Sequence, residues 1–248
     1  PIPLIAETGG MNAMIVDSSA LTEQVVVDVL ASAFDSAGQR CSALRVLCLQ
    51  DEIADHTLKM LRGAMAECRM GNPGRLTTDI GPVIDSEAKA NIERHIQTMR
   101  SKGRPVFQAV RENSEDAREW QSGTFVAPTL IELDDFAELQ KEVFGPVLHV
   151  VRYNRNQLPE LIEQINASGY GLTLGVHTRI DETIAQVTGS AHVGNLYVNR
   201  NMVGAVVGVQ PFGGEGLSGT GPKAGGPLYL YRLLANRPES ALAVTLAR

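Results

Sequence analysis

Short apolar runs alternate along the chain with longer stretches in which apolar residues recur every three or four positions. The runs predict buried strands, and the longer stretches predict amphipathic helices. Unbroken apolar strands separated by helices are typical of a mostly parallel sheet that is covered on both faces. The pattern therefore predicts an α/β fold. The expected strands are 12–16, 43–49, 106–110, 125–133, 147–153, 172–177 and 195–199, and the expected helices are 21–37, 53–69, 86–102, 158–167 and 181–191.

The last quarter of the chain departs from this pattern. Ten of the 24 glycines fall between Gly194 and Gly226, and the segment 204–226 has few side chains that could pack. Such a segment is more typical of a functional loop than of a core element. The apolar run 228–234 that follows fits a strand or a short helix whose partner lies elsewhere.

Composition narrows the class of protein. With 248 residues, of which 44% are hydrophobic and 20% are charged, the chain can form a substantial globular core. The net charge of −6 offers no basic stripe, which argues against nucleic-acid binding. No apolar run is long enough for a membrane span. Because the chain starts at Pro1 without a methionine, we expect it to be a piece of a longer protein.

The three cysteines and five histidines show no metal-binding pattern. Cys41, Cys48 and Cys68 form no CxxC pair, and the histidines form neither HxH nor HExxH, so we expect no metal. An odd number of thiols is also a poor disulfide framework, which favours a reducing cytoplasm.

Cys41 is a candidate nucleophile. It lies in the sequence GQRCS (38–42), in a turn between a predicted helix and a buried strand, beside Arg40. A nearby cation can lower the pKa of a thiol and make it reactive. Taken alone, this context is a weak signal, because a small buried hydrophobic residue explains most cysteines, and that is our interpretation of Cys48 and Cys68.

Two carboxylates lie in glycine-containing turns. Glu7 begins ETGG (7–10) before a buried strand, at a sheet end where sites of α/β proteins tend to lie, although a solvated turn would explain it too. Glu142 and Phe144 are presented together by EVFGPV (142–147), for which a plain β-turn is the alternative. The glycine-rich stretch 210–219 contains no GxGxxG between a strand and a helix, so it is no Rossmann fingerprint. Its glycines would still let backbone N–H groups approach an anion.

The order and spacing of these four motifs resemble the aldehyde dehydrogenase superfamily over essentially the whole chain: ETGG, GQRCS, EVFGPV and PFGGEGLSG (211–219). Met11 departs from the lysine that most members carry, at a position outside the chemistry. The stretches 6–12, 41–43, 203–214 and 218–227 are similar, more narrowly, to glutamate-semialdehyde dehydrogenases, in particular to the second catalytic unit of bifunctional proline-catabolic flavoproteins.

This resemblance implies catalytic and cofactor roles. Cys41 would attack the aldehyde as a thiolate, and hydride transfer to NAD would leave a thioester. Glu7 would act as general base in the hydrolysis of that thioester. Glu142 would accept hydrogen bonds from the nicotinamide ribose, and Phe144 would orient the nicotinamide.

The same resemblance implies how the substrate is held. Ser42 and the backbone of Gly204 and Ala205 would bind the amino-acid end of glutamate semialdehyde, and Phe212 would line the aliphatic middle. Only two acidic residues, Glu215 and Glu239, follow Glu182, which suits a region that faces an anionic substrate.

The resemblance also implies a larger assembly. Residues 1–218 would form the catalytic domain, and the tail 219–248 would return to an NAD-binding domain or serve between subunits. The NAD-binding part and an FAD-dependent proline dehydrogenase part would precede this chain in a cytoplasmic homo-oligomer, which leaves open a peripheral association with the inner membrane. The isolated piece would then bind NAD poorly and be inactive. The alternative is a non-catalytic aldehyde-dehydrogenase-like module kept for oligomerisation.

Overall fold

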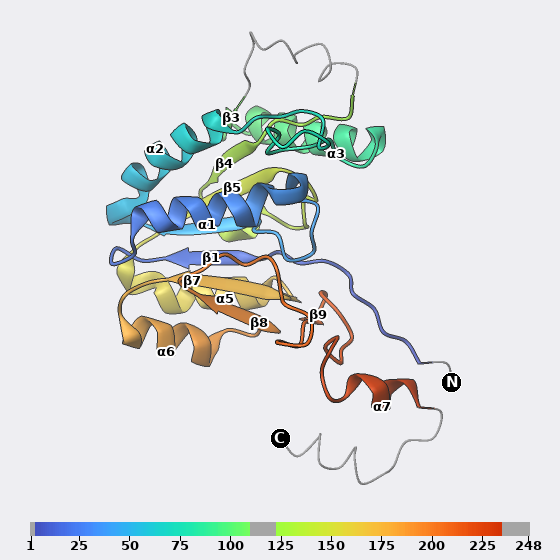
Figure 1. The fold of residues 1–248 in the computed structure, drawn as a ribbon. Coiled ribbons are helices and arrows are strands. Elements are labelled where there is room, and N and C mark those ends of the chain that lie inside the picture. Colours follow the sequence, from blue (N-terminus) through green and yellow to red (C-terminus); the bar gives the residue numbers. More distant parts are fainter. Residues whose placement is uncertain (1–2, 110–122, 235–248) are drawn as a thin grey trace.

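A seven-stranded sheet organises the chain (Figure 1), of which the computed structural model describes residues 3–109 and 123–234. The strand order is β3-β4-β5-β2-β1-β7-β8. All neighbours are parallel except the edge pair β3 and β4. The strands are β1 (Ala13–Val16), β2 (Val46–Gln50), β3 (Val106–Gln108), β4 (Thr129–Leu133), β5 (Val147–Tyr153), β7 (Thr173–His177) and β8 (Asn195–Val198).

The central strands are apolar on both faces because both faces are covered. Every residue of β1, β2 and β7 is buried. Consecutive crossovers between parallel neighbours are right-handed. The units β1-α1-β2 and β7-α6-β8 step in opposite directions along the sheet, so α1 and α6 lie on opposite faces. The predicted α/β fold with a mostly parallel sheet and helices on both faces is thus confirmed.

The helices follow the amphipathic stretches closely. α1 and α2 pack against each other on one side of the sheet. The helices are α1 (Thr22–Phe34), α2 (Asp51–Glu67), α3 (Ser86–Ser101), α5 (Leu158–Ala167), α6 (Asp181–Ser190) and α7 (Tyr229–Leu233), with short 3-10 turns η1 (Asp35–Gly38), η2 (Phe136–Glu138) and η3 (Arg155–Gln157).

The predicted elements differ from the structure mainly at their ends. The helix expected over 21–37 stops at Phe34, because Ser36, Ala37 and Gly38 adopt positive φ angles of 57°, 54° and 67°. These angles turn the chain towards β2. The run 228–234 contains the short helix α7, none of whose residues is buried. The last residue of the expected strand 106–110, and the segments 111–122 and 235–248, lie outside the described residues.

The C-terminal loops form a second, small layer beside the main sheet (Figure 1). Strand β6 (Tyr170–Gly171) pairs with β9 (Glu215–Gly216) in an antiparallel ribbon. The expected domain boundary between 218 and 219 stays a prediction. Across the described residues, no helix is both long and apolar enough to cross a membrane, and no three His, Cys, Asp or Glu side chains are grouped as a metal site would require.

Candidate active site

The candidate residues meet at one edge of the parallel sheet. Glu7 precedes β1, Cys41 precedes β2 and Glu142 precedes β5. These strands are consecutive in the sheet, in the order β5-β2-β1. Because the strands are parallel, the loops that enter them gather at the amino-terminal edge. Open α/β sheets usually bind ligands at the carboxyl edge. The general rule that we applied to Glu7 therefore predicts a site at the carboxyl edge, whereas the structure places Glu7 at the amino-terminal edge.

Asn12 anchors the turn that carries Cys41. Its side chain is buried, and its Nδ2 donates to the carbonyl oxygens of Cys41 at 2.7 Å and Ala43 at 2.8 Å. Its Oδ1 accepts from the backbone N–H of Thr173 at 3.2 Å. One amide side chain thus joins the starts of β1, β2 and β7. Sequence reasoning assigned it no role, although an amide at the head of a buried apolar run was a usable signal.

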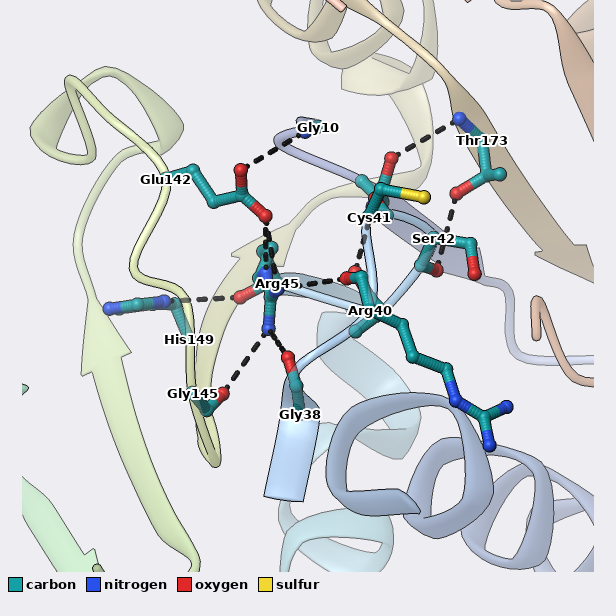
Figure 2. Close-up of polar contacts among 12 residues, drawn as sticks. Gly10, Gly38, Arg40, Cys41, Ser42, Arg45, Glu142, Gly145, His149 and Thr173 are labelled. Carbon is teal, nitrogen blue, oxygen red and sulfur yellow. Dashed lines mark hydrogen bonds and ion pairs between the residues drawn. The ribbon is translucent and has the colours of Figure 1, made fainter. Parts of the chain in front are cut away.

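The Cys41 side chain is half-buried, and at neutral pH it is a thiol rather than a thiolate. Burial raises its pKa, and the carboxylates of Glu7 and Glu142 raise it further, while backbone N–H groups lower it by a smaller amount. Arg40 does not offset this, because its Nε donates to Ser36 Oγ at 3.1 Å and its side chain runs away from the sulfur (Figure 2). The expectation that Arg40 lowers the thiol pKa is therefore wrong.

Glu7 lies against the glycine-rich loop. Its Oε1 is 3.4 Å from the position that a Cβ would take at Gly213, and its Oε2 is 3.5 Å from the corresponding position at Gly219. The carboxylate thus lies at van der Waals distance from a Cβ at either glycine. Partial burial raises the pKa of Glu7, which moves it towards the range of a base that works near neutral pH.

Backbone pairing with the same loop holds Glu7 in place. Glu7 and Gly219 form an antiparallel bridge, and the N–H of Thr8 donates to Ser218 O at 3.1 Å. The N–H of Thr220 donates to Ala6 O at 3.1 Å. The serine and glycine that end PFGGEGLSG therefore fix the segment that carries the candidate base, and this role was not foreseen from the sequence.

Glu142 is engaged by a buried arginine. Its Oε1 accepts from Arg45 Nε at 3.1 Å and Nη2 at 3.0 Å, and its Oε2 accepts from the N–H of Gly10 at 3.2 Å (Figure 2). The ring of Phe144 is 47% exposed and its centroid lies 5.2 Å from Arg45 Cζ. Sequence analysis overlooked Arg45; a single charged residue within the apolar run 43–49 was the available signal.

The expected substrate residues come from three separate segments. Ser42 is buried in the Cys41 turn, where its carbonyl accepts from Thr173 Oγ1 at 3.4 Å. Gly204, with φ +81°, lies next to the half-buried Ala205 in the loop after β8, and nothing lies within 4 Å of the position of its missing Cβ. Phe212 is half-buried and pairs with Ala224. The Gly204 backbone is thus open to a ligand, as an anchoring loop requires.

Two histidines extend the polar network behind Arg45. His149 Nδ1 lies 3.1 Å from the Arg45 carbonyl oxygen, so it carries the proton, and its Nε2 accepts from His95 Nε2 at 2.8 Å. Burial, followed by the charge on His95, lowers the pKa of His149 from 6.5 to about 3. Burial and then the cations Lys102 and Lys141 lower the pKa of His95. At neutral pH the folded protein therefore holds both rings uncharged.

This neutral pair predicts acid sensitivity. The unfolded chain takes up a proton at His149 below about pH 6.5 whereas the folded chain does not until about pH 3, so stability is lost as pH falls through this window. Between pH 7 and pH 5 the loss is on the order of 1–2 kcal/mol. Urea unfolding at the two pH values should show this loss, and His149→Gln should show less of it. His56→Gln, at an exposed position of α2, is the control; equal losses in all three proteins would refute the assignment.

Comparisons with known proteins find relatives that match almost the whole chain. Residues 2–235 match the model of the aldehyde dehydrogenase family. All 248 residues align at 93% identity with the bifunctional protein PutA of Salmonella typhimurium. The crystal structure of bifunctional proline utilization A superimposes with a TM-score of 0.86 at 53% identity, over 93% of this chain and 23% of that one. A 1-pyrroline-5-carboxylate dehydrogenase from Thermus with bound NAD gives a TM-score of 0.82 at 36% identity, over 92% of this chain and 43% of that one.

The chain covers only part of the length of each of these relatives. The chain spans 19% of the length of the Salmonella typhimurium protein.

Proposed function

Because the chain belongs to the aldehyde dehydrogenase family, we propose that it is the catalytic part of an NAD-dependent enzyme that oxidises glutamate semialdehyde to glutamate. The observation that carries this proposal is that Glu7 and Cys41, a base and a nucleophile, lie in the segments that lead into the neighbouring parallel strands β1 and β2, at the same edge of the sheet. The similar proteins named PutA and 1-pyrroline-5-carboxylate dehydrogenase support the choice of substrate.

Cys41 forms the covalent bond to the substrate. Its thiolate attacks the aldehyde carbon to give a thiohemiacetal, and loss of hydride from that carbon leaves a thioester on Cys41. The backbone N–H of Cys41 lies in the turn that Asn12 holds, so it is fixed in position to stabilise the oxyanion. Because the resting group is the thiol and it is only half-buried, its proton passes to solvent water before the thiolate attacks.

Glu7 completes the turnover. A water molecule attacks the thioester, and the Glu7 carboxylate takes a proton from that water, which releases glutamate and restores Cys41. The raised pKa of Glu7 makes its carboxylate a stronger base than an ordinary glutamate. Backbone pairing with the 217–220 segment holds the stretch that carries Glu7 in place before β1.

NAD, when bound, supplies the acceptor for the hydride. The residues present suit its nicotinamide ribose, because Glu142 Oε2 accepts only the 3.2 Å bond from Gly10 among the described residues and retains a lone pair for a hydroxyl. The Glu142 side chain is 13% exposed, so a ligand can reach it. The exposed ring of Phe144 is available to orient the nicotinamide.

The amino-acid end of the substrate is assigned to Ser42, Gly204 and Ala205. The open backbone of Gly204 can present its N–H to a carboxylate, and a serine hydroxyl can donate a second hydrogen bond. Phe212 then lines the aliphatic middle. Gly204 and Ala205 lie on a different segment from Cys41, which would select an aldehyde of fixed length.

We further propose that the chain acts within a longer polypeptide. The rest of that polypeptide would hold NAD and an FAD-dependent proline dehydrogenase part, in a cytoplasmic homo-oligomer. Leu230 and Leu233 of α7 are 74% and 52% exposed, which suits a tail that packs on the NAD-binding part or on another subunit. The partial coverage of the PutA relatives supports this arrangement.

A specificity measurement tests the function. The longer polypeptide should show a kcat/KM for glutamate semialdehyde well above that for propanal. Ser42→Ala should raise KM for glutamate semialdehyde about 10-fold, the size of one lost hydrogen bond to a charged group, and leave propanal nearly unchanged. A wild-type enzyme that prefers propanal would overturn the substrate assignment.

A glycine contact should govern the placement of Glu7. Gly194 approaches Gly213 so closely that a Cβ at Gly194 would lie 1.7 Å from the Gly213 carbonyl oxygen. Gly194→Ala must displace the loop that holds Glu7, and we expect aldehyde oxidation to fall about 100-fold, as misplacement by about 1 Å does elsewhere. Gly189→Ala in α6, with nothing within 4 Å, is the matched control and should keep full activity. Equal rates in the two variants would contradict this placement.

A further inference from the structure

Arg45 is a fully buried cation that the reaction scheme above does not use. Its side chain has no solvent exposure, and burial of a charge is costly unless every polar group is paired. All five of its N–H groups have acceptors. Nε and Nη2 donate to Glu142 Oε1, Nη1 donates to Gly38 O at 2.8 Å and Gly145 O at 3.2 Å, and Nη2 also donates to Arg40 O at 3.1 Å.

These acceptors belong to two loops that are distant in the sequence. Gly38 and Arg40 flank the turn of Cys41, whereas Glu142 and Gly145 belong to the EVFGPV turn (Figure 2). The loops also touch directly, since a Cβ at Gly38 would lie 2.2 Å from the Gly145 carbonyl oxygen. Three carbonyl groups and a carboxylate thus surround the guanidinium. The planar fork of a guanidinium satisfies all of them, which a lysine ammonium with three donors cannot do.

We propose that Arg45 is a positioning residue that holds the nucleophile turn and the EVFGPV turn in one fixed frame. Given the proposed function, this sets the distance between the Cys41 sulfur and the Glu142 carboxylate that receives the nicotinamide ribose. Hydride transfer requires the substrate carbon on Cys41 and the nicotinamide to meet in one geometry. A single side chain that spans both loops supplies that geometry before either ligand binds.

The charges around Arg45 agree with this placement. Burial lowers the pKa of Arg45, and the Glu142 carboxylate and a Cys41 thiolate each raise it. The guanidinium therefore interacts with both functional groups that it positions. It also lies against the face of Phe144, so both residues assigned to the nicotinamide site, Glu142 and Phe144, contact the Arg45 guanidinium.

The test is Arg45→Lys in the longer polypeptide, with two readouts. Lysine keeps the charge and loses the fork, so both turns should loosen. We expect KM for NAD to rise at least 10-fold. In the cofactor-free protein, iodoacetamide should alkylate Cys41 at least fivefold faster at neutral pH, because burial is the main cause of the raised thiol pKa. Arg152→Lys in β5, which pairs with Asp55 at 2.8 Å on the outside of the sheet, is the control and should change neither readout by more than twofold.

A second variant disturbs the contact between the nucleophile turn and the EVFGPV turn while Arg45 is intact. Gly38→Ala should force the two turns apart and shift both readouts in the same directions. Gly103→Ala is its matched control, because Gly103 also has a positive φ, +77°, and nothing lies within 4 Å of its Cβ position. The proposal is overturned if Arg45→Lys lowers Tm but leaves both readouts within twofold of the controls. If Arg45→Lys does not fold, the same result for Gly38→Ala overturns it.

The two readouts separate this proposal from the proposed function. Alkylation of Cys41 is measured without aldehyde or NAD. If the wild-type polypeptide oxidises no aldehyde while Arg45→Lys still speeds the alkylation, the positioning role stands and the proposed function falls. If aldehyde oxidation is robust and both readouts stay at the control values, the function stands and the positioning role falls.

Discussion

Replacing Cys41 by alanine should abolish NADH production by the longer polypeptide, with a fall in kcat of at least about 10⁴-fold. Without the sulfur, no thiohemiacetal forms and the substrate carbon is never held for hydride transfer. The fold should survive, because the Cys41 turn is fixed through its backbone, whose carbonyl accepts from Asn12 at 2.7 Å. Steady-state NADH formation with saturating glutamate semialdehyde measures the loss.

Cys68→Ala is the control for the loss of a thiol. Cys68 is half-buried at the end of α2, where its Sγ donates to Ala64 O at 3.7 Å, and its variant should retain activity. Full NADH production by Cys41→Ala would instead support the alternative in which this chain is a non-catalytic module kept for oligomerisation.

Glu7→Gln should separate the two halves of the reaction. Acylation of Cys41 does not require the base, so each active site should still release about one equivalent of NADH in a first turnover. Hydrolysis of the thioester then stalls, and steady-state kcat should fall about 10²- to 10⁴-fold, the usual contribution of a general base. Rapid-mixing measurements of NADH followed by mass determination of the acylated protein should show the trapped thioester.

The pH dependence gives this experiment its control. Because partial burial raises the pKa of Glu7, the wild-type kcat should decline as pH falls towards that pKa, which lies above the ordinary glutamate value. Glu7→Gln should lack this decline, and Glu215→Gln, at an exposed position in β9, should keep both the decline and the rate. A Glu7→Gln protein with normal turnover would remove Glu7 from the mechanism.

The regular elements were predictable because local pattern and tertiary burial agree. The apolar runs that became β1, β2, β5 and β7 are buried on both faces, so no alternation was needed to recognise them. The errors occur where a distant contact decides the backbone. α1 ends early where Ser36, Ala37 and Gly38 adopt positive φ angles, and the turn that they form brings Gly38 against the carbonyl of Gly145, which a Cβ would approach to 2.2 Å.

Some residues of the candidate site could be predicted from the sequence and others could not. The four motifs identified Cys41, Glu7 and Glu142, because each lies in a turn with a recognisable sequence. Arg45 and Asn12 were missed because their importance lies in their partners, which belong to loops far away in the chain. The thiol pKa was also misjudged, since neighbours in sequence such as Arg40 can point elsewhere.

Periodicity and motif order are local properties of the chain, so the α/β class, the order of the elements and the family could be inferred from the sequence. Which loops meet depends on how distant segments pack, so it became clear only from the fold. The order β5-β2-β1-β7 brings four strand-leading segments to the amino-terminal edge, where Arg45 and Asn12 bind them together. Charges and hydrogen bonds act over a few ångströms in space rather than along the sequence, so the protonation of Cys41 and the frame that holds it follow from that packing.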